Sequence, residues 1–321
     1  MISDKNELNM KAVVYDKNAS PDKLVLRDVE KPVPAVNEVL VKIIAASVNA
    51  ADYRSLSLGI IPKKKIFGAD IAGRVESVGR NVLQFKPGDE VVGEISAYGS
   101  GGFAEYAVAP EKLLVHKPHA ISFEDAAGLP MAAMTALQAL RDKGNIQAGA
   151  HVLIIGSGGG VGTFAVQLAK YFSARVTAVC STSNMEQAKD LGANDVIDYT
   201  KENFLRSNNS YDIILAVNGN YPLSTCKKCL NPQGTYVMVG GTLTQVFKAI
   251  VFGWAMSLGS KKVCFLSAKS RKQDLEFIMV LANTGRIKPV IETVYPLEKT
   301  AEAVHYLSEG HARGKVVVRV Q

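Results

Sequence analysis

Residues 151–162 read HVLIIGSGGGVG, and this stretch decides the fold. A short apolar run, VLII, leads into a loop with five glycines, and the helix-like sequence TFAVQLAKYF follows at once. A buried strand that turns through glycines into a helix is typical of loops that hold a pyrophosphate, because the helix N-terminus presents free N–H groups and a partial positive charge. The stretch therefore predicts a dinucleotide-binding domain built on parallel strands.

The glycine fingerprint Gly-x-Gly-x-x-Gly fits this loop in two registers. From Gly156 the third position falls on Val161, whereas from Ser157 only the first glycine is replaced. We prefer the second register, in which Gly159 lets the backbone approach the pyrophosphate and Gly162 lets helix and strand pack closely. The residues predicted to contact the cofactor here are Ser157, Gly158, Gly159, Gly160, Val161 and Gly162. The alternative is a glycine-rich turn without a ligand, and the strands and helices that follow argue against it.

The elements on either side of the loop define two domains. From residue 151 onward, strands such as RVTAV (175–179) and YDIILAV (211–217) alternate with helical segments, which predicts a doubly wound parallel sheet. The first third of the chain has short β-branched strands punctuated by glycines, which is typical of a small, strongly bent barrel. The last strand, KVVVRV, is placed to rejoin that barrel. We expect an α/β protein with a β domain at 1–128 plus 290–321 and a dinucleotide domain at 129–289.

The composition excludes several classes of protein. Apolar residues make up 47% of the chain and charged residues 21%, which argues against disorder and provides a sizeable core. The net charge of +7 is spread without an arginine-rich run, so we expect no nucleic-acid partner. Four cysteines are too few for a disulfide framework and favour a reducing cytoplasm. We expect no signal peptide, and the longest apolar run, 249–258, is too short for an integral membrane segment.

The end of the second strand of the predicted sheet bears on the choice of cofactor. Residues 180–184 read CSTSN, and no carboxylate appears before Glu186. An acidic residue here would bind the ribose 2′-hydroxyl of NAD, whereas short polar side chains donate to the 2′-phosphate of NADP. The predicted cofactor is therefore NADPH, with Lys189 and Lys201 as helpers. The residues expected around the 2′-phosphate are Cys180, Ser181, Ser183 and Tyr199.

Several motifs occur in an order that resembles one known family. They are VNAADYR (48–54), GADIAGRVESVG (68–79), FKPGDEVVG (85–93), GGFAEYAV (101–108), SGGGVGTFAVQLAK (157–170) and GKVVV (314–318). Over almost its whole length the chain is similar to the medium-chain dehydrogenase/reductase superfamily. It most resembles the zinc-independent quinone oxidoreductase branch, including relatives of the plastid-envelope quinone oxidoreductase. The resemblance implies a GroES-like β-barrel with a Rossmann domain, hydride transfer from NADPH to quinones or α,β-unsaturated carbonyl compounds, and a homodimer.

The zinc enzymes of this superfamily carry metal ligands that this sequence lacks. The resemblance places a catalytic Cys near residues 49–52 and a His-Glu pair after Gly68, where this chain has no Cys and reads Ala69-Asp70. A catalytic zinc needs three N, S or O ligands from the protein, so we predict no metal. Cys226 and Cys229 form one C-x-x-C pair without a second pair, which is a weak zinc or redox signal.

The resemblance also assigns the remaining site residues. The predicted catalytic residues are Asn49, Asp52, Tyr53 and Arg54. Tyr53 and Arg54 would face the substrate carbonyl, and Asp52 would orient its neighbours. Tyr53 has an equal alternative as a packed barrel side chain, and solvent is an alternative source of the proton. The other residues expected around the cofactor, several of them at strand ends of the sheet, are Thr135, Asn218, Gly240, Gly241, Phe265, Leu266, Ser267 and Lys315.

Residues 246–258, VFKAIVFGWAMSL, are more apolar than a surface element should be. They suit a lid over a lipophilic substrate, a peripheral contact with a membrane surface beside Lys261 and Lys262, or packing in the core or in a dimer contact. Two alternatives to a quinone or enone reductase also stay open. One is a zinc-free alcohol dehydrogenase-like reductase of another substrate class, and the other is a non-catalytic NADPH-binding sensor.

Overall fold

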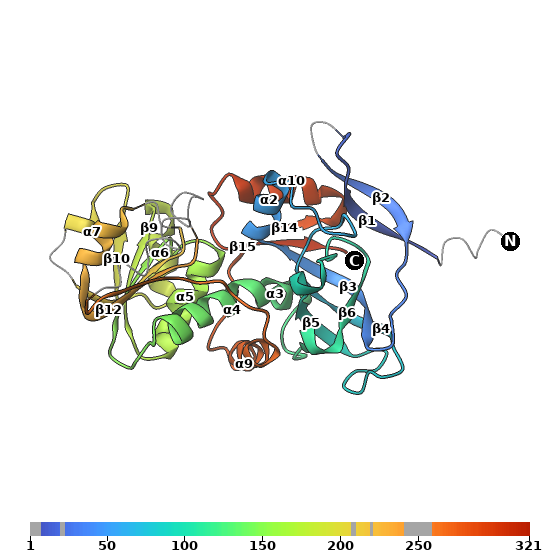
Figure 1. The fold of residues 1–321 in the computed structure, drawn as a ribbon, viewed down its shortest axis with the longest axis horizontal. Coiled ribbons are helices and arrows are strands. Elements are labelled where there is room, and N and C mark those ends of the chain that lie inside the picture. The colour runs from blue at the N-terminus through green and yellow to red at the C-terminus, as the bar shows by residue number, and fades with distance from the viewer. Residues whose placement is uncertain (1–7, 20–22, 207–209, 219–220, 241–258) are drawn as a thin grey trace. The chain divides into compact units, whose positions relative to one another are not determined.

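The computed structural model describes residues 8–19, 23–206, 210–218, 221–240 and 259–321, and its chain divides into two compact units (Figure 1). The barrel unit comprises Met1–Met131 and Ser270–Gln321, and the dinucleotide unit comprises Ala132–Lys269. The expected domains met at 128/129 and 289/290. The two boundaries between the units therefore differ from the expected ones. The larger difference is at the second boundary, because residues 270–289, which we expected in the dinucleotide domain, belong to the barrel unit.

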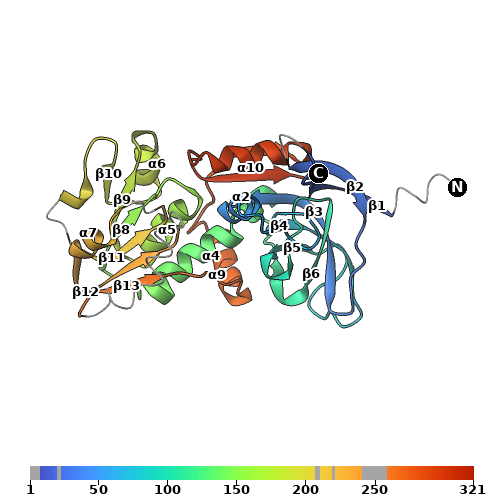
Figure 2. The same ribbon diagram turned by 45° about the horizontal axis from the view of Figure 1, so that its top comes forward.

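The barrel unit is built on a seven-stranded sheet with the order β14-β15-β3-β4-β5-β7, and β6 also pairs with β3 (Figure 2). β14 and β15 are parallel, whereas the other pairs are antiparallel. The pairing of β15 with β3 confirms that the last strand rejoins the N-terminal part. A separate hairpin pairs β1 with β2. The strands are β1 (Asn9–Tyr15), β2 (Leu24–Glu30), β3 (Glu38–Val48), β4 (Asp70–Val78), β5 (Glu90–Glu94), β6 (Tyr106–Pro110), β7 (Leu114–His116), β14 (Ile291–Pro296) and β15 (Lys315–Arg319).

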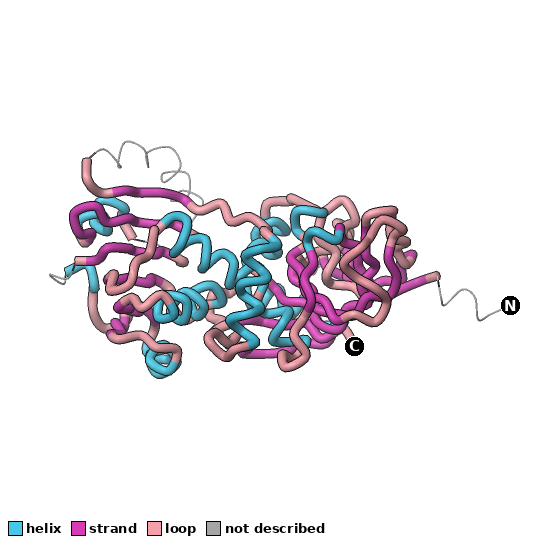
Figure 3. Tube along the Cα trace, turned by 90° about the horizontal axis from the view of Figure 1, so that it is seen from below, coloured by secondary structure: helices cyan, strands magenta, loops and turns pink. Residues whose placement is uncertain are grey.

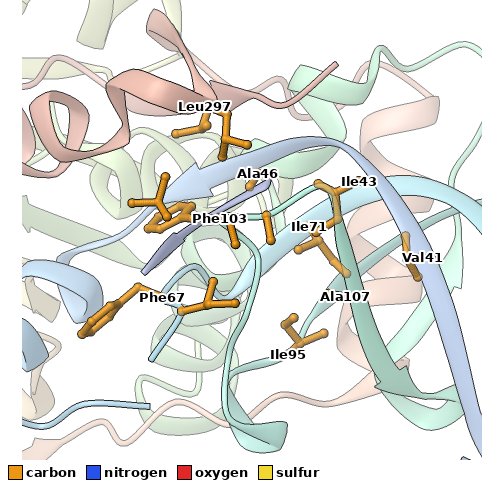
Figure 4. Packing of buried hydrophobic residues seen from close by; sticks show 14 of the residues in the cluster. Val41, Ile43, Ala46, Phe67, Ile71, Ile95, Phe103, Ala107 and Leu297 are labelled. Carbon is orange, nitrogen blue, oxygen red and sulfur yellow. The ribbon is translucent and has the colours of Figure 1, made fainter. Parts of the chain in front are cut away.

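Apolar side chains fill the interior of the barrel unit (Figure 4). Phe103, Ile43 and Ile71 are all fully buried in this core. Most of β3 is buried because the strand lies between β15 and β4. Gly73 lets β3 and β4 pair closely, since a Cβ at this position would lie 2.1 Å from the carbonyl oxygen of Lys42.

Four α-helices accompany the barrel strands in the described residues: α2 (Ala50–Ser57), α3 (Phe123–Gly128), α9 (Lys272–Asn283) and α10 (Thr300–Ser308). The Ser122 hydroxyl caps α3 by accepting the Asp125 N–H at 3.0 Å. α10 contacts α2, and α9 contacts β7. The contacts between α9 and β7 agree with the assignment of residues 270–289 to this unit.

The dinucleotide unit contains a six-stranded sheet with the order β10-β9-β8-β11-β12-β13, and every pair is parallel. This confirms the predicted doubly wound sheet, whose strands lie side by side in Figure 3. The chain steps outward from β8 to β10 and then crosses to β11, so the strand order reverses between β8 and β11, where ligands of such sheets bind. The strands are β8 (His151–Ile155), β9 (Arg175–Cys180), β10 (Asp195–Asp198), β11 (Tyr211–Ala216), β12 (Leu230–Met238) and β13 (Lys262–Phe265). The α-helices of this region are α4 (Pro130–Gln138), α5 (Gly160–Tyr171), α6 (Met185–Asp190) and α7 (Leu223–Lys228).

Part of the predicted machinery lies outside the described residues, namely Gly241 and the apolar segment 246–258. Within the described part of the chain, no helix combines the length and apolarity needed to cross a membrane. The four cysteines are all free thiols.

We expect Phe103→Ala to lower the free energy of unfolding of the barrel unit by about 3–5 kcal/mol, because it leaves a cavity in a closed core. Leu83→Ala, at a side chain that is 90% exposed, should change it by less than about 0.5 kcal/mol. Urea unfolding followed by circular dichroism compares the two variants. Equal effects would show that the core around Phe103 relaxes without cost.

Candidate active site

The turn after β8 depends on Gly156. Its φ of +84° is a backbone conformation that residues with a Cβ rarely adopt. Ser157 follows in a buried position, where its hydroxyl and its N–H both donate to the carbonyl oxygen of Val179 at 3.1 Å. The preferred register placed Ser157 at the first glycine position, whereas the left-handed residue of the turn is Gly156. In the sequence, the position of Gly156 directly after the apolar run was the only sign that the left-handed residue would be at this position.

Gly159 and Gly162 have opposite surroundings at the start of α5. A Cβ on Gly162 would lie 2.1 Å from the carbonyl oxygen of Gly156, so only glycine lets the helix pack against the turn. A Cβ on Gly159 would meet nothing within 4 Å. No side chain caps this 12-residue helix. Its first helical hydrogen bond runs from the Thr163 N–H to Gly159, which leaves the preceding N–H groups, Gly160 to Gly162, without a helical acceptor.

The other predicted strand-end residues gather at the same edge of the sheet. Asn218 lies against the turn, because a Cβ on Gly156 would be 3.1 Å from the Asn218 Cβ. The Gly240 N–H bonds to Ala216 at 3.4 Å, and the Leu266 N–H bonds to Met238 at 2.8 Å. Phe265 ends β13, and Ser267 follows Leu266. Thr135 is separate from this edge in sequence and lies buried in α4.

The residues predicted around the 2′-phosphate lie at the ends of β9 and β10. The Tyr199 N–H bonds to the carbonyl oxygen of Cys180 at 3.1 Å, and the Tyr199 side chain is half exposed. The Ser181 and Ser183 hydroxyls are 3.1 Å apart. Burial raises the pKa of the Cys180 thiol, so this group stays a neutral thiol near neutral pH. The structure therefore brings Cys180, Ser181, Ser183 and Tyr199 together.

Asp198 is a carboxylate that the sequence reasoning missed at this place. It pairs with Cys180 in the β9–β10 ladder, so its carboxylate lies beside the polar stretch despite the distance in sequence. Hydrogen bonds from the Thr182 and Thr200 hydroxyls lower its pKa to about 2, so it is ionised at neutral pH. The Lys201 ammonium is 3.5 Å from the same carboxylate. In the sequence, only the alternation of strands and helices indicated that the strand ending at Asp198 would lie beside the strand ending at Cys180.

These features fit a dinucleotide. Gly159 leaves open space at the helix N-terminus, where N–H groups without helical acceptors and the helix dipole favour phosphate. Hydroxyl donors lie at the neighbouring strand end. The donor set therefore suits a pyrophosphate at α5 and a ribose at the end of β9.

A second cluster lies in the barrel unit, where Asn49 and Asp52 fix the start of α2. The Asn49 N–H donates to the Asp52 carboxylate at 2.8 Å, and the Gly68 N–H donates to its other oxygen at 3.1 Å. Asp52 is 5% exposed and Asn49 is 6% exposed. Asp52 thus joins the first turn of α2 to the segment that enters β4.

Asp70 lies at the centre of this cluster and is fully buried. One carboxylate oxygen accepts from the Ser47 hydroxyl at 3.0 Å and the Asn49 amide at 2.9 Å, and the other accepts from the Met131 N–H at 3.0 Å. The Lys315 ammonium lies 3.8 Å from Asp70 and donates to the Asn49 amide oxygen at 2.7 Å. Lys315, which the resemblance placed beside the cofactor, is therefore buried among the residues predicted to be catalytic.

Burial dominates the acid–base properties of this cluster. It raises the pKa of Asp52 to about 6 and that of Asp70 to about 7, against the opposing effect of Lys315. It also lowers the pKa of Lys315, which the two carboxylates partly offset. Glu94, 4% exposed, raises the pKa of both aspartates further. The cluster therefore places one ammonium among several acidic side chains, and the aspartates hold protons more tightly than they would in water.

The other two predicted catalytic residues differ in their surroundings. Tyr53 is half-buried and packs against the barrel core, as its alternative interpretation proposed. Arg54 is exposed, with its guanidinium carbon 5.8 Å from the centre of the Tyr53 ring. The side chain of Asn49 is fully engaged inside the cluster, so Asn49 holds Lys315 and Asp70 in place rather than offering a free donor.

Among the residues that the structure describes, no group of three or more His, Cys, Asp and Glu side chains is placed to hold a metal ion. The Asp70 carboxylate stands where the resemblance placed the second residue of a His-Glu pair, and Lys315, Asn49 and Ser47 already contact it. Zinc independence itself stays a prediction.

Comparison with known proteins gives a consistent result. Residues 35–119 match the alcohol dehydrogenase GroES-like domain, and residues 191–318 match the model described as zinc-binding dehydrogenase. A chloroplastic quinone oxidoreductase of Triphysaria versicolor is 36% identical over 96% of this chain and 98% of its own. A chloroplastic NADPH-dependent alkenal/one oxidoreductase of Arabidopsis thaliana is 33% identical over 96% of this chain and 79% of its own. The solved quinone oxidoreductase of Coxiella burnetii has a TM-score of 0.87 and 30% identity, covering 98% of this chain and 100% of that chain.

Two glycine variants separate dinucleotide binding from folding. Gly159→Ala adds a methyl group into open space without backbone strain, so we expect an unchanged melting temperature and at least a roughly tenfold weaker dinucleotide affinity. Gly162→Ala forces the methyl group against Gly156 and should cost about 1–3 kcal/mol of stability. Thermal melts and fluorescence titration with the cofactor measure both. Undiminished affinity in Gly159→Ala would contradict a pyrophosphate at this turn.

The raised pKa values of Asp52 and Asp70 predict the sign of a pH effect. Both groups stay protonated in the folded barrel at pH values where the unfolded chain has lost these protons, so stability should fall as the pH rises from about 4 to about 7. Asp70→Asn replaces one of the two titrating carboxyl groups with a neutral amide. It should therefore reduce the loss of unfolding free energy between about pH 4 and pH 7 by about 2–4 kcal/mol. Urea unfolding across this pH range tests it, with Asp28→Asn at an exposed position of β2 as the control. If the unfolding free energy depends on pH equally in the wild type and in Asp70→Asn, the pH effect does not come from Asp70.

Proposed function

Because the chain belongs to the medium-chain dehydrogenase/reductase superfamily, in its quinone oxidoreductase-like branch, we propose that it is an NADPH-dependent reductase of quinones or α,β-unsaturated carbonyl compounds. The branch makes it an oxidoreductase with a nicotinamide cofactor. The observation that carries the proposal is the open N-terminus of α5 behind the Gly156 turn, which suits a dinucleotide. The relatives named as quinone and alkenal/one oxidoreductases favour an enzyme over a non-catalytic sensor.

The dinucleotide unit would hold the cofactor through its backbone. The N–H groups at the start of α5 would bind the pyrophosphate, and Gly159 would let it approach. Gly162 keeps the helix against the turn, so these donors keep their direction. When bound, the reduced nicotinamide supplies a hydride to an electron-poor carbon of the substrate.

The preference for NADPH rests on the end of β9. Ser181 and Ser183 offer hydroxyl donors beside the exposed Tyr199, and each of these groups is a good partner for a 2′-phosphate. Asp198, which pairs with Cys180 at the end of β10, is a carboxylate that opposes this preference. Its oxygens already accept from Thr182 and Thr200, and Lys201 offsets its charge. The name of the Arabidopsis relative, which specifies NADPH, agrees with the preference.

The chemistry proposed for the barrel unit needs no zinc. Hydride addition to a conjugated carbon moves negative charge to an oxygen of a quinone or enone, and hydrogen-bond donors or a cation stabilise that charge. Lys315 is the cation of the buried cluster, and Asn49 fixes its ammonium at 2.7 Å. Asp52 and Asp70 hold α2 and β4 around it. Asn49, Asp52 and Asp70 are thus positioning residues in this proposal.

The function is tested by following NADPH oxidation against a panel of quinones, alkenals and enones in the presence of a metal chelator. We expect turnover of at least one of these classes, unchanged by the chelator, and no turnover of simple alcohols with NADP. Loss of activity together with one bound zinc per chain would contradict the zinc-free mechanism. Cofactor binding without turnover of any panel member would favour the sensor.

In the same titrations we expect NADPH to bind more tightly than NADH. Ser181→Asp would place a carboxylate beside the 2′-phosphate and should reverse much of that preference, whereas Ser181→Ala should only weaken it. Equal affinities for both cofactors in the unchanged protein would refute the role of residues 180–183. The homodimer and the cytoplasmic location remain proposals, which size-exclusion chromatography and cell fractionation would test.

A further inference from the structure

The loop that leaves α2 combines exposed apolar side chains with a run of lysines. Residues 58–65 read LGIIPKKK. The side chains of Leu58 and Ile60 are 53% and 62% exposed, although both are aliphatic. Lys63, Lys64 and Lys65 follow, and all three are exposed. Isolated exposed aliphatic residues are ordinary, but here two of them occur in one loop with three consecutive exposed lysines.

Neighbouring elements extend this surface. The Lys64 ammonium is 5.7 Å from the centre of the Tyr98 ring, and Tyr98 is 40% exposed. On the other side, the Tyr15 N–H bonds to the carbonyl oxygen of Lys65 at 2.7 Å, so the end of β1 lies against the lysine run. We call Leu58, Ile60, Tyr98, Lys63, Lys64 and Lys65 the α2 patch.

Among the described residues, the lysines of the patch lack close acidic partners, although partial burial lowers the pKa of Lys64 and Glu38 partly offsets this. Within the described parts of the chain, Lys63, Lys64 and Lys65 form no ion pair within 4.0 Å. The exposed lysines at positions 17 and 23, which lie between β1 and β2 in the sequence, likewise form none. Two acidic residues are near. Glu38 accepts the Tyr98 hydroxyl and attracts Lys64, and Asp16 lies 3.8 Å from Arg27.

We propose that the α2 patch docks the protein onto the surface of an anionic lipid bilayer. The lysines would lie among the anionic headgroups, and Leu58 and Ile60 would enter the boundary between headgroups and acyl chains. Tyrosine suits this boundary because its ring is apolar and its hydroxyl is polar. A nucleic acid or an acidic protein segment would also attract the lysines, but neither explains two exposed aliphatic side chains in the same loop.

The position of the patch on α2 links docking to the candidate site. The helix begins after Asn49 and ends at Ser57, and its eight residues span about 12 Å. Docking would therefore hold the buried Asn49–Asp70–Lys315 cluster close to the bilayer. If the proposed function is correct, lipophilic quinones dissolved in that bilayer are the substrates brought nearest. The docking itself does not depend on that function.

The test measures co-sedimentation of the full chain with vesicles of phosphatidylcholine, with or without phosphatidylglycerol. We expect binding only to vesicles that contain phosphatidylglycerol, and weaker binding at higher salt. The triple variant Lys63→Ser, Lys64→Ser, Lys65→Asn should bind roughly 100-fold more weakly, at about fivefold for each lysine. Asn is chosen at position 65 because Lys65 has a φ of +57° and Asn tolerates this conformation.

Two further variants identify what the patch recognises. Arg80→Ser, Lys86→Ser, Lys112→Ser removes the same charge from exposed positions outside the patch and should keep most of the vesicle binding. Leu58→Ser, Ile60→Ser should lose vesicle binding and keep its binding to heparin, a polyanion without acyl chains. All variants should keep the wild-type melting temperature and the turnover of a water-soluble quinone.

Several results would overturn the proposal. The first is equal binding to vesicles with and without phosphatidylglycerol, and the second is an equal loss of vesicle binding in the two triple charge variants. The third is full vesicle binding by Leu58→Ser, Ile60→Ser, which would make the patch a general polyanion site. Vesicle binding by a protein that reduces no quinone or enone would leave docking intact and contradict only the proposed function. Turnover of soluble quinones without vesicle binding would support the proposed function and contradict the docking.

Discussion

The ammonium of Lys315 lies 2.7 Å from the amide oxygen of Asn49 and 3.8 Å from the carboxylate of Asp70, and these contacts connect parts of the barrel unit on either side of a long insertion. Lys315 begins the last strand, Asn49 precedes α2, and Asp70 begins β4. Removing one partner of a buried charge pair typically costs about 3–5 kcal/mol, because the other charge is left without compensation. The same side chains thus connect the last strand, the start of α2 and the start of β4.

The resemblance places a His-Glu pair where this chain has Ala69-Asp70, and the cluster gives Asp70 its partners from within the chain. A bound metal would bring positive charge to the acidic groups, whereas here Lys315 provides it from within the chain. Ser47, Asn49 and the Met131 N–H satisfy the remaining lone pairs of Asp70, which reduces the cost of burying it. Asp52 is similarly satisfied by the N–H groups of Asn49 and Gly68. Each carboxylate of the cluster therefore has partners from within the chain, as the predicted zinc-free site requires.

The sequence predicted the fold from patterns that are local. The run VLII before the glycines and the alternation after residue 151 indicated the parallel sheet, and the β-branched strands at both ends indicated the barrel. It did not assign α9 to the barrel, since the periodicity of a helix shows which face is buried but not which strand covers it. It also did not show that the positive φ of the turn falls on Gly156, because the sign of φ is set by the turn and not by the spacing of the glycines.

Long-range pairing explains the remaining differences in the site. Asp198 follows a full strand–helix–strand unit after Cys180, and only the β9–β10 register places the two side by side. A carboxylate at this position would ordinarily repel a 2′-phosphate, but its effect depends on how its lone pairs are used. The Asp198 carboxylate accepts hydrogen bonds from Thr182 and Thr200, and the Lys201 ammonium lies 3.5 Å away. These partners use its lone pairs and offset its negative charge. The same hydrogen bond orders Thr182 between Ser181 and Ser183, so Asp198 helps to shape the polar strand end on which the cofactor preference depends.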